Sequence, residues 1–511
     1  MVETAARPSG LIGVAAAAVA LGVAQLSAVP FGPHADSRNA VGSAVIDLTP
    51  GPVKETAIRL FGTSDKLALS ILVLVVIGVI AALTGQRETR SRPVGSIAIV
   101  VAGILGCAAV LSRAGATGID LVPTVIGTVC GVLTLRLLVS DRVGPTPTSE
   151  QPAPDAGRRR SMVALGLLAT GVVAGVAGAL LNRLHSSVAG DRTAFTLPTA
   201  RDGAPPPPPA AVAPPGFTKT PFITPNADFY RIDTALSVPQ VSRGDWRLRI
   251  HGMVDREVTL TFDDLQRFDV VEEVVTLTCV SNPVGGDLIS NAKWTGYRVR
   301  DLLAGAGIHS DADMVLSTSI DGFTAGTPVE ALTDQRGSLL AIGMNDAPLP
   351  TEHGYPARLV VPGLYGYVSA TKWLVDLELT RFDRAEAYWT KLGWAARGPI
   401  KTESRIDVPR SGAEIPRGST TFGGVAWAQQ RGIEAVEVRI DEGPWQQAEL
   451  GASYSNDTWR LWSFPWQAAE PGPHRITVRA TDGTGAVQTS DEADVVPDGA
   501  TGWHTVSFDV A

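Results

Sequence analysis

Cysteine is scarce in this 511-residue chain, and the scarcity limits how the fold can be held together. The three cysteines are Cys107, Cys130 and Cys279. The first two fall inside long apolar runs, whereas Cys279 stands alone in a polar region, so no disulfide framework can form around it. The stretch TLTCVSNPVGG therefore contains a thiol without a sulfur partner.

Several functional signatures are also missing. The net charge is −8 and no stretch is dense in Lys and Arg, which argues against the phosphate-neutralising surface that nucleic-acid binding needs. No G-x-S-x-G, H-E-x-x-H, paired C-x-x-C, Walker A or C-x-x-C-H motif occurs. The seven histidines all lie outside the apolar runs, so we expect no bis-histidine haem between membrane helices.

Long apolar runs are plentiful before residue 185. Each is long enough to cross a hydrocarbon core of roughly 30 Å as a helix. The alternative is a soluble bundle of buried helices, for which outward-facing apolar surfaces would be unusual. The five predicted spans are 10–32, 67–84, 93–112, 118–139 and 161–182.

The arginines between the apolar runs predict the orientation. They concentrate in GQRETRSRP and in GRRRS, whereas the loop between the third and fourth runs has only Arg113. With positive charge inside, the N-terminus is cytoplasmic and everything after the fifth run is outside. Arg159 and Arg160 before a Gly/Ala-rich helix also resemble a twin-arginine export signal, which carries folded domains; the alternative is a topology signal alone. We therefore expect a multi-pass protein of the inner or plasma membrane.

Composition divides the chain into four parts. Short β-rich runs with Gly/Pro punctuation follow a proline-rich stretch, and after residue 400 short alternating strands alone remain, a pattern typical of an immunoglobulin-type sandwich. The prediction is a multi-domain protein with a membrane region of five helices at 1–184, a Pro-rich linker at 185–216, an α+β core at 217–400, and an immunoglobulin-like β-sandwich at 401–511.

Cys279 has three interpretations on its residues alone. It could be a buried structural thiol, a nucleophile that needs a nearby base, or a soft ligand to a metal whose other ligands come from a cofactor. Sequence cannot place the base.

Four segments around Cys279 resemble the molybdopterin-binding core of the sulfite oxidase family. They are NADFYRIDTALSVPQV, LTCVSN with ISNAKWTGYRVRDLL, LPTEHGYPARLVVPGLYG and SATKWL. The run HGYPAR is the most specific of these matches, because the family has H-G-x-P-x-R there. The resemblance covers about residues 217 to 400, and the C-terminal sandwich lies where the family has a dimerisation domain, so a homodimer is possible.

The resemblance implies an oxidoreductase with one molybdenum and one pterin. It implies that Cys279 ligates the metal and that Arg231 orients substrate oxygen. The cofactor-binding residues that it implies are Tyr230, Arg231, Cys279, Asp321, His353, Arg358, Thr371 and Lys372. Independently, a phosphate on the pterin needs cationic donors such as the fork of Arg358 and the point charge of Lys372.

The sequence departs from the family at substrate-facing positions. Pro283 and Val284 stand where the family has two arginines, Trp394 stands in place of a tyrosine, and Asp498 in place of another arginine. Because sulfite needs cationic donors to offset its lost hydration, we expect reduction of a neutral S-oxide or N-oxide rather than sulfite oxidation. Sulfite oxidase proper and a non-catalytic binding or adhesion protein are the alternatives. We also expect a small-molecule substrate and a separate electron carrier, either a haem protein or one linked to quinone.

Overall fold

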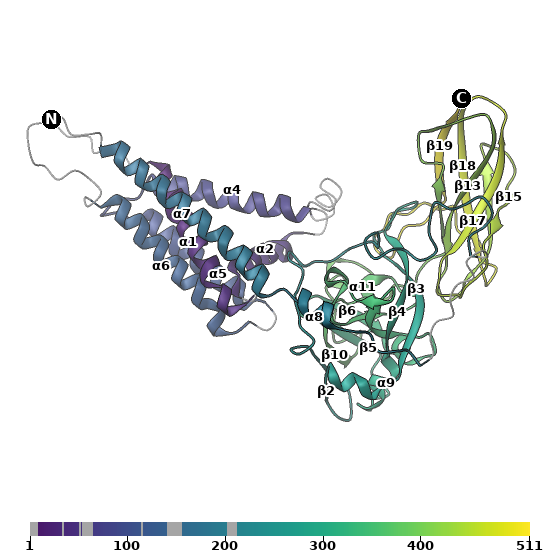
Figure 1. The fold of residues 1–511 in the computed structure, drawn as a ribbon, viewed down its shortest axis with the longest axis horizontal. Coiled ribbons are helices and arrows are strands. Elements are labelled where there is room, and N and C mark those ends of the chain that lie inside the picture. The colour runs from purple at the N-terminus through teal and green to yellow at the C-terminus, as the bar shows by residue number, and fades with distance from the viewer. Residues whose placement is uncertain are drawn as a thin grey trace, which may run out of the picture. The chain divides into compact units, whose positions relative to one another are not determined.

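A computed structural model describes residues 9–32, 35–50, 53, 65–113, 116–140, 156–201 and 212–511 (Figure 1). The chain forms two compact units. One comprises Met1–Ser187 with Ala235–Val238, and the other comprises Val188–Thr234 with Pro239–Ala511. The polyproline run at 205–209, expected to be an extended spacer, lies outside the described residues.

The first unit is helical. Its helices are α1 (Gly10–Ser27), α2 (Ser37–Leu48), α4 (Asp65–Gly85), α5 (Val94–Leu111), α6 (Val122–Val139) and α7 (Ala156–His185), with 3₁₀ turns η1 (Val29–Phe31) and η4 (Gly118–Leu121). Five of these helices are apolar and long enough to cross a membrane, and they coincide closely with the five predicted runs. The sequence did not predict α2, whose first turn is capped by Asp36 through the N–H groups of Arg38 and Asn39.

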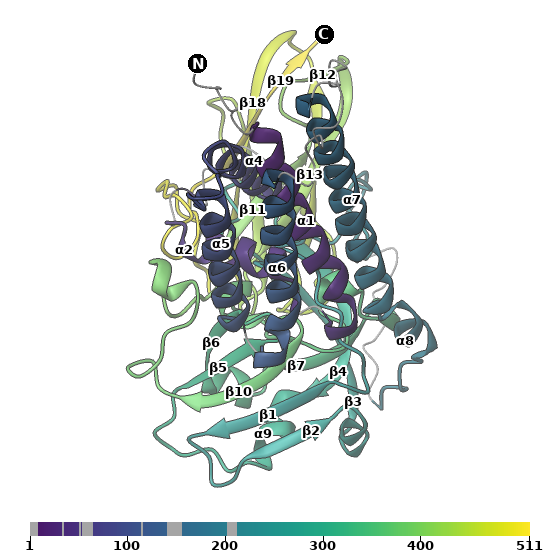
Figure 2. The same cartoon turned by 90° about the vertical axis from the view of Figure 1, so that its left-hand side faces the viewer.

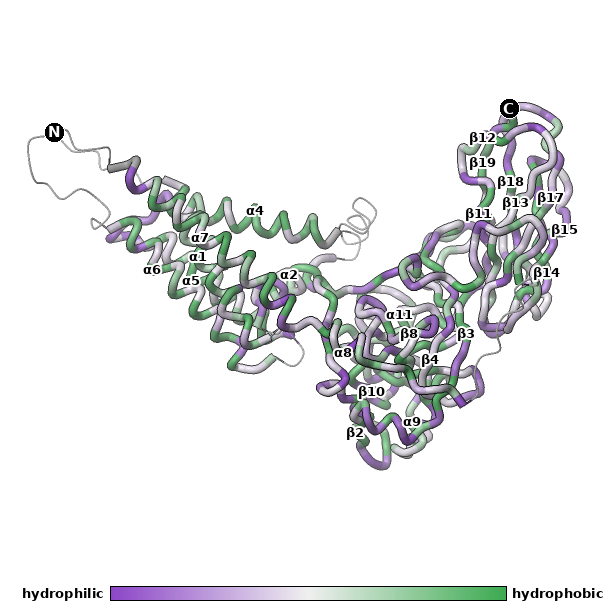
Figure 3. The backbone as a smooth tube through the Cα atoms, in the orientation of Figure 1, coloured by the Kyte–Doolittle hydropathy of each residue, from purple (hydrophilic) through white to green (hydrophobic). Residues whose placement is uncertain are grey.

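Helix α1 lies between α6 and α7 (Figure 2). Small residues permit this close packing: a Cβ added to Gly22 of α1 would collide with the carbonyl oxygen of Gly171 in α7. The long helices are rich in apolar residues (Figure 3), and the side chains of Leu72, Val79 and Ile104 are each more than half exposed. In water such a continuous apolar surface would be unfavourable.

The α+β core of the second unit has two five-stranded sheets. In the first sheet, β1 runs parallel to β10 and the other pairs are antiparallel. The order is β2 (Val258–Thr261), β1 (Arg247–Gly252), β10 (Leu374–Thr380), β5 (Met314–Ser319) and β6 (Thr324–Pro328).

The second sheet is antiparallel and carries the segment with Cys279. Its order is β3 (Val270–Thr278), β4 (Ile289–Arg298), β7 (Leu339–Met344) and β8 (Ala347–Pro348), with β9 (Arg358–Val360) also paired to β7. All six residues of β7 are buried, as expected for a central strand with the sequence LLAIGM. Short helices connect the strands: α9 (Val299–Ala304), α10 (Val329–Thr333), α11 (Gly366–Ser369), η6 (Asp263–Arg267), η7 (Thr351–His353) and η8 (Thr390–Leu392).

Part of the segment expected to be a linker folds with this core. Residues Ala189–Ala194 form α8. Asp191 pairs with Arg243 at 2.9 Å and accepts a hydrogen bond from the hydroxyl of Tyr355, while Arg192 donates to the carbonyl oxygen of Leu349. Val188–Thr234 belongs to the second compact unit, together with the core.

The C-terminal region is all β, in two sheets around a shared core. One sheet is β11 (Glu403–Val408), β13 (Gly418–Trp427), β17 (Arg460–Ala468) and β16 (Glu449–Leu450). The other is β12 (Ala413–Ile415), β19 (His504–Val510), β18 (Gly472–Asp482), β14 (Ile433–Ile440) and β15 (Gln446–Gln447). Phe422 from the first sheet packs edge-on against Phe508 from the second, with ring centroids 5.2 Å apart.

Candidate active site

A pocket opens beside the end of β3, where Cys279 follows the strand directly. Its volume is about 870 Å³, counting the solvent at its mouth, which is within the usual range for small-molecule and cofactor sites. Cys279 is 7% exposed, and its thiol donates to the hydroxyl oxygen of Ser281 at 3.5 Å. Burial raises the pKa of this thiol, so without a cation beside it the sulfur stays protonated.

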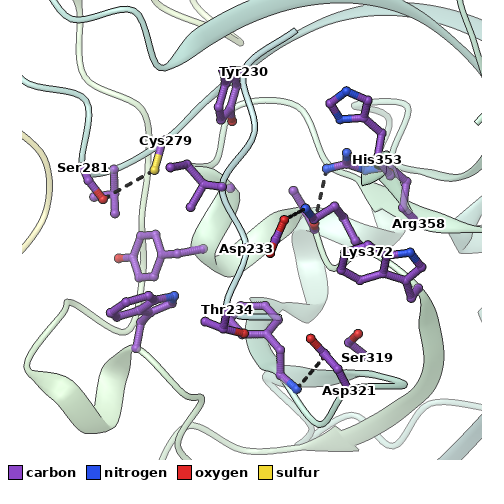
Figure 4. Close-up of a pocket in the computed structure, with 18 of the residues that line it drawn as sticks. Tyr230, Asp233, Thr234, Cys279, Ser281, Ser319, Asp321, His353, Arg358 and Lys372 are labelled. Atoms are coloured by element: carbon purple, nitrogen blue, oxygen red, sulfur yellow. Dashed lines mark hydrogen bonds and ion pairs between the residues drawn. The ribbon is translucent and has the colours of Figure 1, made fainter. Parts of the chain in front are cut away.

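Three nitrogen-bearing side chains lie across the pocket from Cys279 (Figure 4). They come from different elements: His353 ends η7, Arg358 begins β9, and Lys372 precedes β10. All three are at least nine-tenths buried. The positively charged groups of the pocket are thus held opposite its thiol.

Arg358 is a buried cation bound only to neutral groups among the described residues. Its guanidinium donates to the carbonyl oxygens of His353, Leu359 and Ala370 at 3.2 to 3.3 Å, and its carbon lies 5.1 Å from the ring centroid of Trp294. Burial lowers its pKa to about 10. A buried cation without a carboxylate partner is costly, so the site favours an anionic ligand.

Lys372 and His353 lie at the same end of the pocket as Arg358. The ammonium of Lys372 pairs with Asp233 at 2.9 Å and donates to the carbonyl oxygen of Glu352 at 3.2 Å. Burial lowers the pKa of Lys372 to about 8, although Asp233 acts in the opposite direction. Burial, together with the charges of Arg358 and Lys372, lowers the pKa of His353 to about 4, so its imidazole is neutral at pH 7.

These residues fit a pterin that carries a metal at one end and a phosphate at the other. Cys279 offers a soft ligand for the metal, and Arg358 with Lys372 offers the charge that a phosphate needs. The hydroxyl of Ser319 supplies a further sign of a missing polar partner. It lines the pocket, is buried, and has no hydrogen-bond partner among the described residues.

The remaining predicted residues divide between the pocket and its surroundings. Tyr230 and Asp321 line the pocket, and burial raises the pKa of the Tyr230 hydroxyl. Arg231 does not line it: its side chain is 42% exposed and pairs with Asp233 at 2.8 Å. Thr371 is also outside the lining, because its hydroxyl lies 2.7 Å from that of Ser317 inside the core.

Sequence reasoning missed Asp233, the residue that links Arg231 to Lys372. Its signal was weak, since nothing in the local sequence predicts that an aspartate at position 233 meets a lysine at position 372.

An aromatic wall lines another part of the pocket. It consists of Tyr367, Trp389 and Trp394, in which Trp394 lies 6.0 Å from Tyr367 and 6.2 Å from Trp389 between ring centroids. Tyr367 follows Gly366, which also lines the pocket. Among the described residues that line the pocket, Arg358 and Lys372 are the only Lys or Arg side chains.

The positions that depart from the family pattern have different environments. Trp394 lies in the pocket wall, as its sequence position predicts. Pro283 and Val284 do not line this pocket; Val284 instead lies in a second hollow with Gly502 and Trp503. Asp498 pairs with Lys401 at 2.9 Å. The expectation that 283 and 284 face the substrate is therefore not supported by the described pocket.

Comparisons with known proteins agree with the cofactor chemistry of the pocket. Residues 235–389 match the family model described as "Oxidoreductase molybdopterin binding domain". Mitochondrial sulfite oxidase of Mus musculus is 29% identical over 331 residues, or 55% of this chain and 60% of the mouse protein. The chain thus spans about 60% of the length of that relative.

A bacterial protein is covered more completely. The uncharacterized oxidoreductase YuiH of Bacillus subtilis is 33% identical over 153 residues, which are 30% of this chain and 74% of YuiH. Among solved structures, the sulfane dehydrogenase SoxCD from Paracoccus pantotrophus is 25% identical, with a TM-score of 0.47 over 53% of this chain and 75% of that one.

The family match over residues 235–389 and the similarity to YuiH agree with a pocket in which the Cys279 thiol faces the buried side chains of Arg358 and Lys372. The chain belongs to the sulfite oxidase family of molybdopterin-binding oxidoreductases.

Proposed function

We propose that this protein is a membrane-anchored, extracytoplasmic oxidoreductase that reduces a neutral S-oxide or N-oxide with a one-pterin molybdenum cofactor. When bound, the cofactor supplies two-electron redox chemistry and a place for the transferred oxygen atom. Cys279 would ligate the metal, and His353, Arg358 and Lys372 would bind the pterin phosphate. Overall, the oxide takes up two electrons and two protons and yields the reduced substrate and water.

The distribution of charge in the pocket carries this proposal. Arg358 and Lys372 lie across the pocket from Cys279 (Figure 4), where the phosphate would occupy them. The aromatic wall of Tyr367, Trp389 and Trp394 offers an apolar surface to the substrate. Such a wall suits the alkyl or aryl groups of a neutral oxide and does little to replace the hydration of sulfite.

Arg231 would reach the substrate only after a rearrangement. Arg231 is absent from the pocket lining and its guanidinium is bonded to Asp233, which does line the pocket, so an active-site role for Arg231 requires this ion pair to open. An oxide whose oxygen carries partial negative charge could compete for the guanidinium once bound.

The test is a steady-state comparison on cofactor-loaded protein. Sulfite is assayed with an oxidising dye, and dimethyl sulfoxide and trimethylamine N-oxide are assayed with a reduced dye. Among the described residues that line the pocket, Arg358 and Lys372 are the only Lys or Arg side chains, and the phosphate would occupy both. Sulfite would therefore lack charge-assisted hydrogen bonds worth roughly 1.5 to 3 kcal/mol each, which should lower its kcat/KM about a hundredfold or more below that of the better oxide. A kcat/KM for sulfite equal to or above that for both oxides would contradict the proposal.

Trp394→Tyr provides a matched variant. It returns the phenol that the family pattern has at this position, and it should raise the ratio of sulfite to oxide turnover.

Sulfite oxidation proper is the second candidate, because mouse sulfite oxidase is 29% identical over 331 residues. The same assay decides between them.

The membrane anchor, the outward orientation and a separate electron carrier belong to this proposal. Five apolar helices with exposed aliphatic surfaces support the anchor, and the arginine distribution supports the orientation. We expect the carrier to be a haem protein or linked to quinone. A non-catalytic binding protein would not need molybdenum, so elemental analysis with pterin detection on the purified protein excludes or supports that alternative.

A further inference from the structure

The segment that follows Cys279 is a closed turn, named here the cysteine loop (residues 279–288). The N–H of Cys279 donates to the carbonyl oxygen of Leu288 at 3.0 Å, and the N–H of Asn282 donates to the carbonyl oxygen of Cys279 at 3.1 Å. The side-chain oxygen of Asn282 accepts from the N–H of Leu288 at 2.8 Å. The N–H of Gly286 also donates to the carbonyl oxygen of Pro283 at 2.8 Å, so the loop is closed internally, whereas the carbonyl oxygen of Gly286 is bonded from outside the loop.

Arg405 of β11, in the C-terminal sandwich, holds Gly286. Its guanidinium donates to the Gly286 carbonyl oxygen at 2.9 Å and to Asp407 at 2.6 Å. Asp407 also accepts a hydrogen bond from the hydroxyl of Thr220 at 2.5 Å. Arg405 is 9% exposed, and its guanidinium is bonded to both Gly286 and Asp407. These bonds fix the position of the guanidinium beside the loop.

His504 of β19 holds the neighbouring residue, Gly285. The Nδ1 atom of His504 accepts the N–H of Ile406 at 2.9 Å, which fixes the plane of the ring. Gly285 has φ of +74°, and a Cβ at this position would collide with the His504 ring. The ring therefore packs directly on the loop backbone, at a position where only glycine fits.

The sandwich also holds the strand that leads into Cys279. The amide of Gln429 donates to the carbonyl oxygen of Thr276 at 3.0 Å and to the hydroxyl of Thr278 at 3.3 Å. The hydroxyl of Thr276 accepts the N–H of Trp459 at 2.8 Å. Both chain segments that flank Cys279 are thus bound to the C-terminal region.

We propose that Arg405 and His504 are positioning residues, which aim the Cys279 sulfur into the pocket by holding the cysteine loop from the sandwich. This proposal rests on the ligand role of Cys279 proposed above. It assigns to the sandwich a part in building the cofactor site. If the sandwich only stabilised the core, weakening the contact at Arg405 or His504 would lower the melting temperature. It would leave the accessibility of the Cys279 thiol unchanged.

The test measures the alkylation rate of Cys279 by iodoacetamide in full-length, cofactor-free protein in detergent. Peptide mass spectrometry separates Cys279 from Cys107 and Cys130. In Arg405→Lys the planar fork is lost although the charge remains, and in His504→Ala the ring that covers Gly285 is absent. Because Cys279 is nearly buried, both variants should alkylate about tenfold faster than the unchanged protein.

Arg460→Lys is the matched control. Arg460 belongs to the same sandwich and donates to the carbonyl oxygens of Gly451 and Ile433, without contact to the cysteine loop. It should alter the melting temperature about as much as Arg405→Lys does, while the alkylation rate stays within about twofold of the unchanged protein. Alkylation within twofold of this control in both Arg405→Lys and His504→Ala would overturn the proposal. If Arg405→Lys does not fold, His504→Ala decides alone.

A double variant tests the contact itself. Gly285→Ala should speed alkylation because its Cβ collides with the His504 ring, and since both changes break the same contact, the double variant with His504→Ala should react about as fast as the faster single variant. In loaded protein the same variants should shift the sulfur-to-metal charge-transfer absorption, which reports the direction of the sulfur. The alkylation assay uses no cofactor, so its failure is distinguishable from failure of the oxide assay. A double variant whose increase in rate is the product of the two single increases would contradict the contact argued here.

Discussion

At the scale of residues, burial acts on the thiol and on the cations of the pocket in opposite directions. It raises the pKa of Cys279, and it lowers the pKa of Lys372 to about 8 and that of Arg358 to about 10. The cause is shared, because each charged form loses its water. A metal cation at the sulfur and a phosphate at the two cations would each restore the charged form. The charges that the pocket residues favour are therefore complementary to those of the cofactor.

Cys279→Ser tests the metal ligand. A hydroxyl is a weaker and less readily deprotonated ligand than a thiol, so the variant should fold and retain pterin while kcat falls at least about a hundredfold. The measurements are pterin content, molybdenum content and turnover. Cys130→Ser, in helix α6, is the control and should keep full turnover. Full turnover in Cys279→Ser would exclude the ligand role.

Arg358→Lys tests the phosphate contact. The lysine keeps a charge but loses the planar fork, and a lost charge-assisted hydrogen bond costs roughly 1.5 to 3 kcal/mol, or about ten- to a hundredfold in pterin affinity. Pterin retained after extensive dialysis, measured by fluorescence of its oxidised form, reports the loss. Arg243→Lys, at the Asp191 ion pair outside the pocket, should retain the pterin. Equal retention in both variants would mean that Arg358 has a structural role alone.

At the scale of elements, the sequence predicted structure well where local chemistry decides it. The apolar runs predicted the long helices to within a few residues. Helix α2 escaped prediction because its sequence, SRNAVGSAVIDL, is only moderately apolar.

The site was predictable only in part, for a physical reason. His353, Arg358 and Lys372, which were predicted from short runs such as HGYPAR, line one pocket. Arg231 and Val284 do not line it, since the surroundings of their side chains depend on distant partners, Asp233 for the first and the Gly502 region for the second. The position of a residue in a sequence motif does not determine the direction of its side chain when the residue lies in a loop.

The junction between core and sandwich should be sensitive to acid. Burial, followed by the charge of Arg405, lowers the pKa of His504 to about 4, whereas an unfolded histidine titrates near 6.5. Between these values the unfolded chain binds a proton that the folded chain does not. Stability is thus complete above pH 6.5 and falls as the pH drops toward 4, by up to about 1.4 kcal/mol per pH unit.

His504→Gln should remove part of this dependence, because glutamine does not titrate. The pKa of His353 is lowered in the same direction, so His353 contributes a similar pH dependence that remains in the variant. Melting temperatures at pH 7.5 and pH 5.0 in detergent report the difference, which should be smaller in the variant than in the unchanged protein. His309→Gln, at an exposed position, is the control and should keep the full difference. The same difference in His504→Gln as in this control would contradict the linkage.

At the scale of the whole molecule, the fold combines a cofactor domain with helices whose surfaces are aliphatic. Twin-arginine export, as predicted from Arg159 and Arg160, would explain why the two occur in one chain. A domain that takes up its cofactor in the cytoplasm has to cross the membrane in the folded state. Helix α7 carries Arg159 and Arg160 near its start and leads directly to the packed core at Val188. The arginine pair and the cofactor domain are therefore neighbours along the chain, which agrees with the predicted twin-arginine signal.

Replacing Arg159 and Arg160 together by lysine separates export from topology. The charge that sets orientation is preserved, but the guanidinium pair that a twin-arginine translocase recognises is lost, so the core and sandwich should stay on the cytoplasmic side. Protease added to spheroplasts should digest these domains in the unchanged protein and leave them intact in the variant. Arg90→Lys with Arg92→Lys, in the loop before α5, is the matched control and should leave them exposed to protease. If the domains of the Arg159/Arg160 variant are digested as in the unchanged protein, the cluster acts only as a topology signal and the cofactor domain crosses by another route.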